Sequence, residues 1–191
     1  MDNILEQWIL PVFYEKDEQG ERDTIGGQCF VIGSLLITAA HVIENSYKPY
    51  VNIGDEKRYL TKENALVCKY NKREDEDYIV FHFYGEKSPL QFATIKKTSQ
   101  GLICRYYRKQ EKQVVLLQSF AKISPISTEK AFVCEVNPML YEGDSGCPII
   151  NANNEVIGML VGSTEDRACS HICAFQNAAY IKKIIEQCLE N

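Results

Sequence analysis

The sequence has few histidines and no excess of basic charge. Its 191 residues include only three histidines and one tryptophan, and the formal net charge is −5. Because contact with nucleic-acid phosphates requires a positive surface, this balance argues against nucleic acid as the main partner. The one basic and aromatic stretch, residues 105–112, is interpreted as the solvated tip of a β-hairpin.

A leader and a membrane-spanning run are also lacking. Residues 1–8 have no basic start, no uninterrupted apolar core and no small-residue cleavage site, so they do not read as a signal peptide. No apolar run approaches the roughly 20 residues that a membrane helix needs. We therefore expect a cytoplasmic protein without a membrane partner.

The hydrophobic content and the spacing of the apolar segments indicate one β-rich domain. A hydrophobic content of 45% is enough for a packed core in a chain of this length. Short apolar segments separated by turns predict strands, with a connector at 85–100 that holds no clear period. Apolar residues at helical spacing predict a helix over 178–189. The expected strands are 8–14, 26–32, 35–39, 50–53, 58–59, 65–70, 78–83, 102–106, 114–120, 131–136, 148–150, 156–162 and 172–175.

A serine between two glycines, in Gly143-Asp144-Ser145-Gly146, is the most informative motif. The glycines permit a tight turn that can aim backbone N–H groups into one small concavity. Such donors, here those of Gly143 and Ser145, can stabilise the oxyanion of an acyl-transfer reaction. Taken alone the motif is also an ordinary turn sequence.

Serine needs a base, and the base needs an orienting acid. His41 follows the apolar strand 35–39, which places an imidazole at a strand end. Asp77 is the last acid of the run 74–77 before an apolar strand, so it is the acid most readily drawn inside; Asp75 is the runner-up. The alternative for each residue alone is an ordinary role, as a turn serine, a loop histidine or an edge charge.

Three ordered blocks carry a family resemblance. Thr38-Ala39-Ala40-His41, Asp77-Tyr78-Ile79-Val80 and Gly143-Asp144-Ser145-Gly146-Cys147-Pro148 resemble the signature blocks of the trypsin/chymotrypsin-like serine proteases. The resemblance implies an all-β fold, a chymotrypsin-like double antiparallel β-barrel with a C-terminal α-helix. Residues 1–191 would form a single domain, with an N-terminal barrel at about 1–88, a C-terminal barrel at about 100–177 and a helix at 178–190.

The resemblance also implies a function. It implies a serine endopeptidase that cleaves proteins or peptides through His41, Asp77 and Ser145 and an acyl-enzyme, without cofactor or metal. One alternative is a peptide-binding module of the same fold, inactive until a partner protein activates it. Another is a protease that processes a viral polyprotein.

The eight cysteines do not fit the disulfides of secreted relatives. Cys29 is present, but Val42 and Tyr141 stand where its family partner and a second bridging cysteine are expected. Free thiols in a reducing compartment are the better reading. Cys169, His171 and Cys173 alternate like metal ligands, but no fourth ligand is evident, so we expect no zinc site.

The resemblance places the base of the specificity pocket at Met139, with Leu140 beside it. Leu160 stands where glutamine-specific viral relatives usually carry a histidine. These residues favour an apolar side chain before the cut. Residues Val161, Gly162 and Ser163 should bind the substrate backbone as an added strand.

Asp144 raises a question of activation. In secreted relatives this acid pairs with a new N-terminal amine, and Ile25-Gly26-Gly27 resembles such a start. Ile25 is too close to His41 to leave room for the intervening strands. We therefore expect an enzyme that is constitutively active or switched on by a partner, in which Asp144 has another partner of its own.

Overall fold

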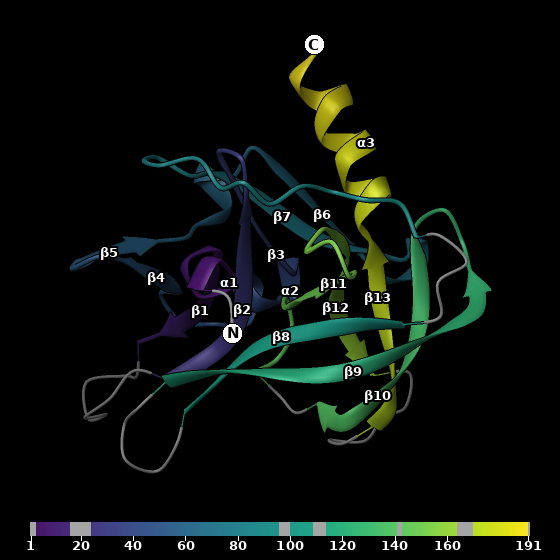
Figure 1. Ribbon diagram of the computed structural model, residues 1–191. Coiled ribbons are helices and arrows are strands. Elements are labelled where there is room, and N and C mark those ends of the chain that lie inside the picture. The colour runs from purple at the N-terminus through teal and green to yellow at the C-terminus, as the bar shows by residue number, and fades with distance from the viewer. Residues whose placement is uncertain are drawn as a thin grey trace.

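The computed structural model describes residues 3–15, 24–95, 100–108, 114–140, 143–163 and 170–190. Figure 1 shows two adjacent β units, with α3 extending from the second. The first unit contains α1 (Asn3–Trp8), β1 (Ile9–Tyr14), β2 (Thr24–Ile32), β3 (Leu35–Thr38), α2 (Ala40–Glu44), β4 (Tyr50–Ile53), β5 (Glu56–Tyr59), a 3-10 turn at Lys62–Asn64, β6 (Val67–Asn71), a 3-10 turn at Lys72–Glu74 and β7 (Glu76–His82). The second contains β8 (Gln100–Arg108), β9 (Val114–Ser127), β10 (Ala131–Leu140), β11 (Pro148–Ile150), β12 (Val156–Ser163), β13 (Ser170–Asn177) and α3 (Ala178–Leu189).

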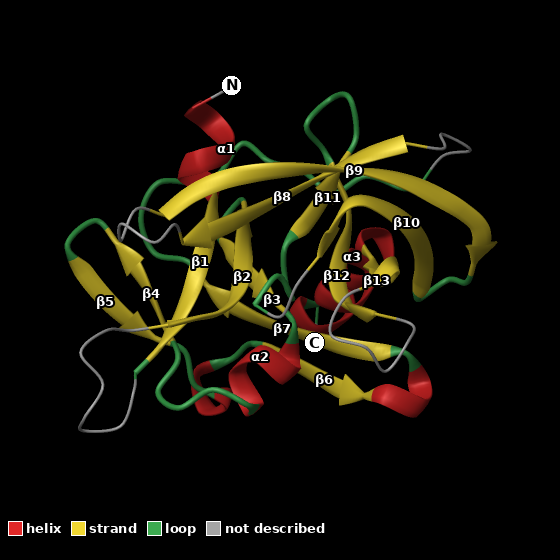
Figure 2. Cartoon of the chain, turned by 90° about the horizontal axis from the view of Figure 1, so that it is seen from below, coloured by secondary structure: helices red, strands yellow, loops and turns green. Residues whose placement is uncertain are grey.

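The two units are built from antiparallel strands but differ in closure. The first is a seven-stranded sheet in the order β5-β4-β1-β2-β3-β7-β6. The second is a closed barrel in the order β10-β13-β12-β11-β8-β9. Figure 2 shows the sheet and the barrel side by side from below. The predicted chymotrypsin-like all-β class is confirmed, with an open sheet where the prediction had a first barrel.

The N-terminus corrects one prediction. Residues 3–8 form a short helix, and the first strand begins at Ile9 instead of Trp8. The helix buries Leu5 and Trp8, which lie three positions apart on one face. Trp8 packs edge to face on Phe83, with ring centroids 6.1 Å apart. A helix of little more than one turn is too short to produce a recognisable hydrophobic period.

Two barrel strands are longer than predicted. β9 runs on past Phe120 to Ser127, and β10 runs on past Val136 to Leu140. In β9, residues 118–123 alternate between exposed and buried, as expected for a strand with one face in the barrel core. Exposed polar residues at alternate positions made these strands look shorter in the sequence.

The C-terminal helix was predicted correctly, and it packs against the barrel. The Asn177 side chain accepts a hydrogen bond from the Ala179 N–H, which caps the first turn. Tyr180, Ile181 and Ile185 are buried within a hydrophobic cluster that also contains residues of the first sheet. That cluster therefore ties the two units together. Within the described residues, no helix has the length and apolar character needed to cross a membrane.

Candidate active site

The loop that carries Ser145 requires both of its glycines. Gly143 and Gly146 have φ values of 92° and 89°, a region that other residues rarely adopt. A Cβ on Gly146 would lie 2.1 Å from the carbonyl oxygen of Gln28 and 2.5 Å from Thr38 Oγ1. The predicted tight turn is thus present, and it lies against β2 and β3.

β12 holds the other side of this loop. The Gly146 N–H donates to the Leu160 carbonyl at 2.8 Å, and the Leu160 N–H donates to the Cys147 carbonyl at 2.9 Å. Within the loop, the Cys147 N–H donates to the Asp144 carbonyl at 3.1 Å. Since the peptide between Asp144 and Ser145 is planar, this bond fixes the direction of the Ser145 N–H on its opposite side.

His41 and Asp77 form a close pair. His41 lies in α2, immediately after β3, while Asp77 lies near the start of β7. The His41 Nδ1 atom is 2.5 Å from Asp77 Oδ2, and the His41 backbone N–H donates to Oδ1 at 2.9 Å. One carboxylate thus fixes both the ring and the backbone of the histidine, which leaves Nε2 available for proton transfer.

The structure distinguishes Asp77 from Asp75. Asp77 is buried, whereas Asp75 is exposed and has a left-handed φ of 54° at the end of a 3-10 turn. Gln176 of β13 holds this segment: its Oε1 accepts from the Asp77 N–H at 2.9 Å, and its Nε2 donates to the Asp75 carbonyl at 2.9 Å. A buried glutamine of the barrel therefore positions the start of β7, a contact that the sequence did not indicate.

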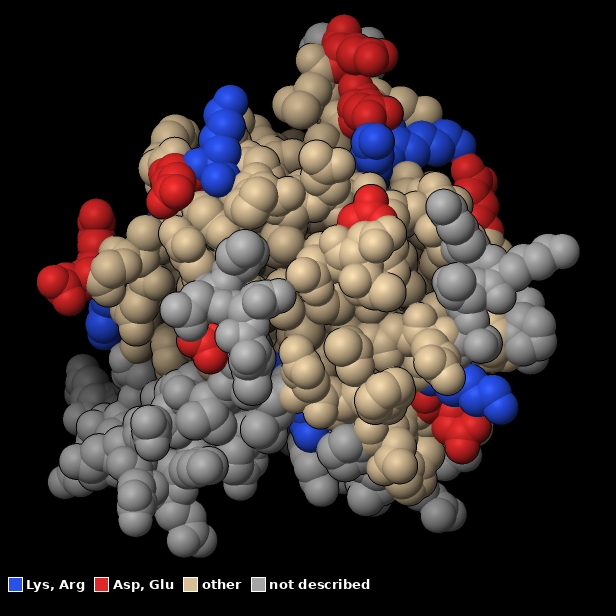
Figure 3. All heavy atoms as spheres, viewed as in Figure 1, with Lys and Arg blue, Asp and Glu red and all other residues tan. Residues whose placement is uncertain are grey.

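Asp144 has the partner that the sequence left unassigned. Its Oδ2 lies 2.6 Å from Nη1 of Arg105 on β8, and both side chains are buried. Arg105 was interpreted as part of a solvated basic hairpin tip, and for this residue that interpretation is wrong. Residues 109–112 of the same stretch lie outside the described residues. On the face drawn in Figure 3, the described basic side chains are scattered among acidic ones and form no continuous patch.

Gln28 of β2 is a second residue that the sequence did not single out. Its side chain is fully buried; Nε2 donates to the Gly143 carbonyl at 2.9 Å, and Oε1 accepts from the Tyr106 N–H at 2.9 Å. Its backbone N–H donates to the Ser145 carbonyl at 2.8 Å. A polar residue inside an otherwise apolar strand was the available signal, because buried amides need partners.

The residues expected to bind substrate are placed as follows. Leu140 and Leu160 are buried, at 5% and 3% exposure, in the core of the barrel. Val161 and Gly162 of β12 are half-buried. The side chains of Met139 and Ser163 lie outside what the structure describes, although both residues belong to strands.

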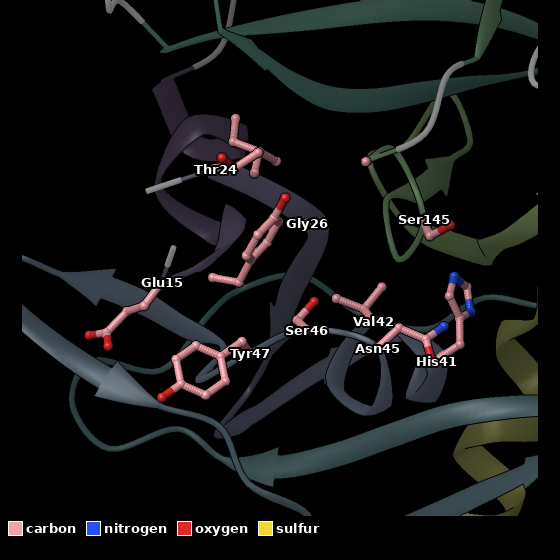
Figure 4. A pocket seen from close by; sticks show the side chains of 12 residues that line it. Glu15, Thr24, Gly26, His41, Val42, Asn45, Ser46, Tyr47 and Ser145 are labelled. Atoms are coloured by element: carbon pink, nitrogen blue, oxygen red, sulfur yellow. The ribbon is translucent and has the colours of Figure 1, made fainter. Parts of the chain in front are cut away.

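A cavity of about 820 Å³ borders Ser145 and His41. Gly143 and Ser145 form one part of its wall, and β1, β2 and α2 with the loop after it form the rest. Figure 4 shows His41 and Ser145 at one end of this pocket and Glu15 and Tyr47 at the other. Ser145, His41 and Gly143 therefore line one concave surface.

Cys147, two positions after Ser145, is not an alternative nucleophile. It is fully buried, and burial raises the pKa of its thiol well above the usual value, with a further contribution from the Asp144 carboxylate. The reactive thiolate is therefore disfavoured. No disulfide joins the seven cysteines that the structure describes, namely 29, 68, 104, 134, 147, 173 and 188. No cluster of metal-ligating side chains occurs among the described residues, and Cys169 lies outside them.

The fold and this arrangement define the class of protein that the chain resembles: proteases of the chymotrypsin fold. Neither a protein-family model nor a curated protein matches the sequence. Among solved structures, the active form of the Rv3671c protease from M. tuberculosis matches with a TM-score of 0.65 at 20% identity, over 95% of this chain and 81% of that one. The catalytically active tobacco etch virus protease in complex with product matches with a TM-score of 0.67 at 14% identity, over 98% and 81%. Kallikrein-related peptidase 10 in complex with Zn²⁺ matches with a TM-score of 0.65 at 14% identity, over the full length of both. At these identities the likeness establishes the fold.

Proposed function

We propose that this chain is a serine endopeptidase that cleaves peptide bonds through Ser145, His41 and Asp77. The observation that carries the proposal is the His41–Asp77 pair beside the same cavity as a serine on a glycine turn. A binding role alone would not require an imidazole fixed by a buried carboxylate next to a serine hydroxyl.

The reaction follows from these positions. His41 Nε2 takes the hydroxyl proton while Ser145 Oγ attacks the peptide carbonyl carbon, and the N–H groups of Gly143 and Ser145 receive the oxyanion. His41 then gives the proton to the leaving amine as the C–N bond breaks. Water, deprotonated by His41, attacks the acyl-enzyme and releases Ser145. Asp77 stays ionised throughout and holds the imidazole in one tautomer.

The enzyme is active without cleavage before Ile25. Arg105 already supplies the positive charge that a new N-terminal amine would bring to Asp144. Ile25 also lies within β2, opposite Phe13 of β1, so a cut there would divide a paired strand. Fluorophosphonate labelling of the uncut chain would support this. An active enzyme whose mature N-terminus is Ile25 would contradict it.

The acyl half of the substrate lies along β12. Val161, Gly162 and Ser163 offer the backbone edge. An apolar side chain before the cut fits the apolar character of Met139, with Leu140 and Leu160 in the barrel core. The substrates are proteins or peptides. A peptide panel varied only at the residue before the cut measures this preference, and a strong preference for Arg or Glu contradicts it.

A fluorophosphonate probe tests the proposed function. We expect covalent labelling of Ser145, seen by peptide mass spectrometry, and loss of labelling in Ser145→Ala. Removing Ser145 or His41 should lower kcat about a millionfold, and Asp77→Asn about ten-thousandfold. Ser127→Ala, at an exposed position on β9, is the matched control and should leave labelling unchanged. Binding of peptides without any labelling of the folded protein would instead support the binding module.

A further inference from the structure

The cavity extends well away from the reacting groups, on the side opposite to β12. β12 contacts the serine loop at Gly146 and Cys147, whereas the cavity meets the loop at Gly143 and Ser145. If the acyl half of a substrate follows β12, then the half that leaves with the new amine must enter this cavity. This step rests on the proposed function.

Tyr14 and Ser46 can lie against the cavity floor because Gly26 has no side chain. In the pairing of β1 with β2, Val12 lies opposite Gly27 and Phe13 opposite Ile25, so Gly26 is the extra residue of a β-bulge. A Cβ at position 26 would lie 2.8 Å from Tyr14 Cδ1 and 3.0 Å from Ser46 Oγ. Any larger residue would therefore push the Tyr14 ring or the Ser46 hydroxyl out of its place in the cavity wall.

The walls are aromatic and aliphatic. Tyr14 and Tyr47 line the cavity, together with Ile25 and Val42. Tyr47 is 59% exposed, although large aromatic side chains are usually well covered. Tyrosine rings bind other aromatic rings by stacked or edge-to-face contacts. These walls favour a bulky apolar or aromatic side chain.

The carboxylate on the cavity wall already has cationic partners. Glu15 is the one carboxylate among the described lining residues. It accepts a hydrogen bond from the Tyr59 hydroxyl, and its oxygens lie 3.9 Å from Lys48 Nζ and 3.8 Å from Lys57 Nζ. A carboxylate with two cations and a hydroxyl donor around it offers little to a basic side chain. A neutral side chain fits better.

We propose that this cavity, walled by Tyr14, Ile25, Val42 and Tyr47 over Gly26, is a subsite that selects a neutral aromatic residue just after the scissile bond. An aromatic residue at the first position of the leaving half would pack between the tyrosine rings. Binding there holds the departing amine, and in the reverse direction the attacking amine, next to His41.

Acyl transfer to an added amine measures the preference of this subsite separately from the preference for the residue before the cut. An ester substrate first forms the acyl-enzyme on Ser145. An added amino-acid amide can then attack the acyl carbon: its amine forms a C–N bond, the bond to Ser145 Oγ breaks, and His41 carries the amine proton to Oγ. We expect L-tyrosinamide to capture the acyl group about tenfold better than glycinamide, relative to hydrolysis. Argininamide and aspartic acid diamide should resemble glycinamide.

Two variants assign any preference to this cavity. Tyr47→Ala removes one wall, and the methyl group of Gly26→Ala displaces the Tyr14 ring that forms another. Each should reduce the preference for tyrosinamide to about that for glycinamide, with ester hydrolysis retained. Tyr84→Ala, at a tyrosine 72% exposed and outside this cavity, is the matched control and should keep it. Three outcomes would overturn the proposed subsite while leaving the proposed protease activity intact. They are equal capture by all amides, preference for a charged amide, and a tyrosinamide preference that both variants retain. Absence of ester hydrolysis and of Ser145 labelling would overturn the protease, and the subsite with it.

Discussion

Arg105 of β8 and Asp144 of the serine loop form a buried ion pair, with 2.6 Å between Nη1 and Oδ2. Asp144 directly precedes Ser145, while Arg105 belongs to β8 of the barrel. The pair therefore ties the serine loop to β8. It also gives Asp144 a permanent positive partner.

Removal of the Arg105 side chain should lower both the stability of the fold and the labelling of Ser145. In Arg105→Met the Asp144 carboxylate stays buried without its main counter-charge, which should lower the free energy of unfolding by about 3–5 kcal/mol and abolish labelling of Ser145. Chemical denaturation and fluorophosphonate labelling measure the two effects. The double variant Arg105→Met/Asp144→Leu should regain much of the stability but not the labelling. Lys182→Met, which breaks an exposed pair on α3, should cost less than about 1 kcal/mol; similar losses in both single variants would contradict the prediction.

Gln28 should act as a positioning residue for the serine loop. Gln28→Met keeps the length of the side chain but loses the hydrogen bonds to the Gly143 carbonyl and the Tyr106 N–H. Because small displacements of reacting groups are costly, we expect kcat to fall by as much as about 100-fold while KM changes little.

The split between kcat and KM separates this role from simple destabilisation, which would lower the amount of active enzyme without changing the rate per labelled site. Active-site titration with the fluorophosphonate gives that amount. Gln118→Met, at an exposed glutamine of β9, is the matched control. An unchanged kcat per titrated site in Gln28→Met would refute the positioning role.

Gly146 should not tolerate alanine. Its φ of 89° is unfavourable for other residues, and the new methyl group would lie 2.1 Å from the backbone carbonyl oxygen of Gln28, which cannot move without shifting β2. Thermal unfolding should show a large loss of stability, of about 3 kcal/mol or more, in Gly146→Ala. Gly162→Ala serves as the stability control, because a Cβ there meets nothing within 4 Å. Equal melting temperatures for the two variants would show that the loop adapts.

Cys147 should resist alkylation although it lies only two positions after Ser145, the proposed nucleophile. Its raised pKa keeps the thiol protonated at pH 8, and burial excludes the reagent, so iodoacetamide should not modify it in the folded protein. The exposed Cys188 should react under the same conditions. Mass spectrometry of peptides after brief treatment, with and without denaturant, makes the comparison. Rapid modification of Cys147 in the folded chain would show that the region opens.

Much of the fold and of the candidate site could be read from local patterns. The strands near Leu35, Tyr50 and Pro148 alternate or run apolar between turn residues, and the helix over 178–189 repeats its apolar residues at helical spacing. The glycines around Ser145 are required by the positive φ of their own positions. The order of His41, Asp77 and Ser145 is a property of the chain itself. These features are local, so the sequence alone determined them.

Contacts between distant segments were decided only by the tertiary structure. Asp77 was preferred to Asp75 from the sequence, but the carboxylate that contacts His41 is seen only once β7 lies beside α2. Arg105 looked like a solvated charge because its neighbours are basic, and folding buried it on Asp144. Gln28 and the cavity at Gly26 depend on which strands pair and on where a bulge falls. A side chain's partner across the fold leaves no periodic trace in the sequence, since hydrogen bonds and burial are fixed by packing rather than by neighbours along the chain.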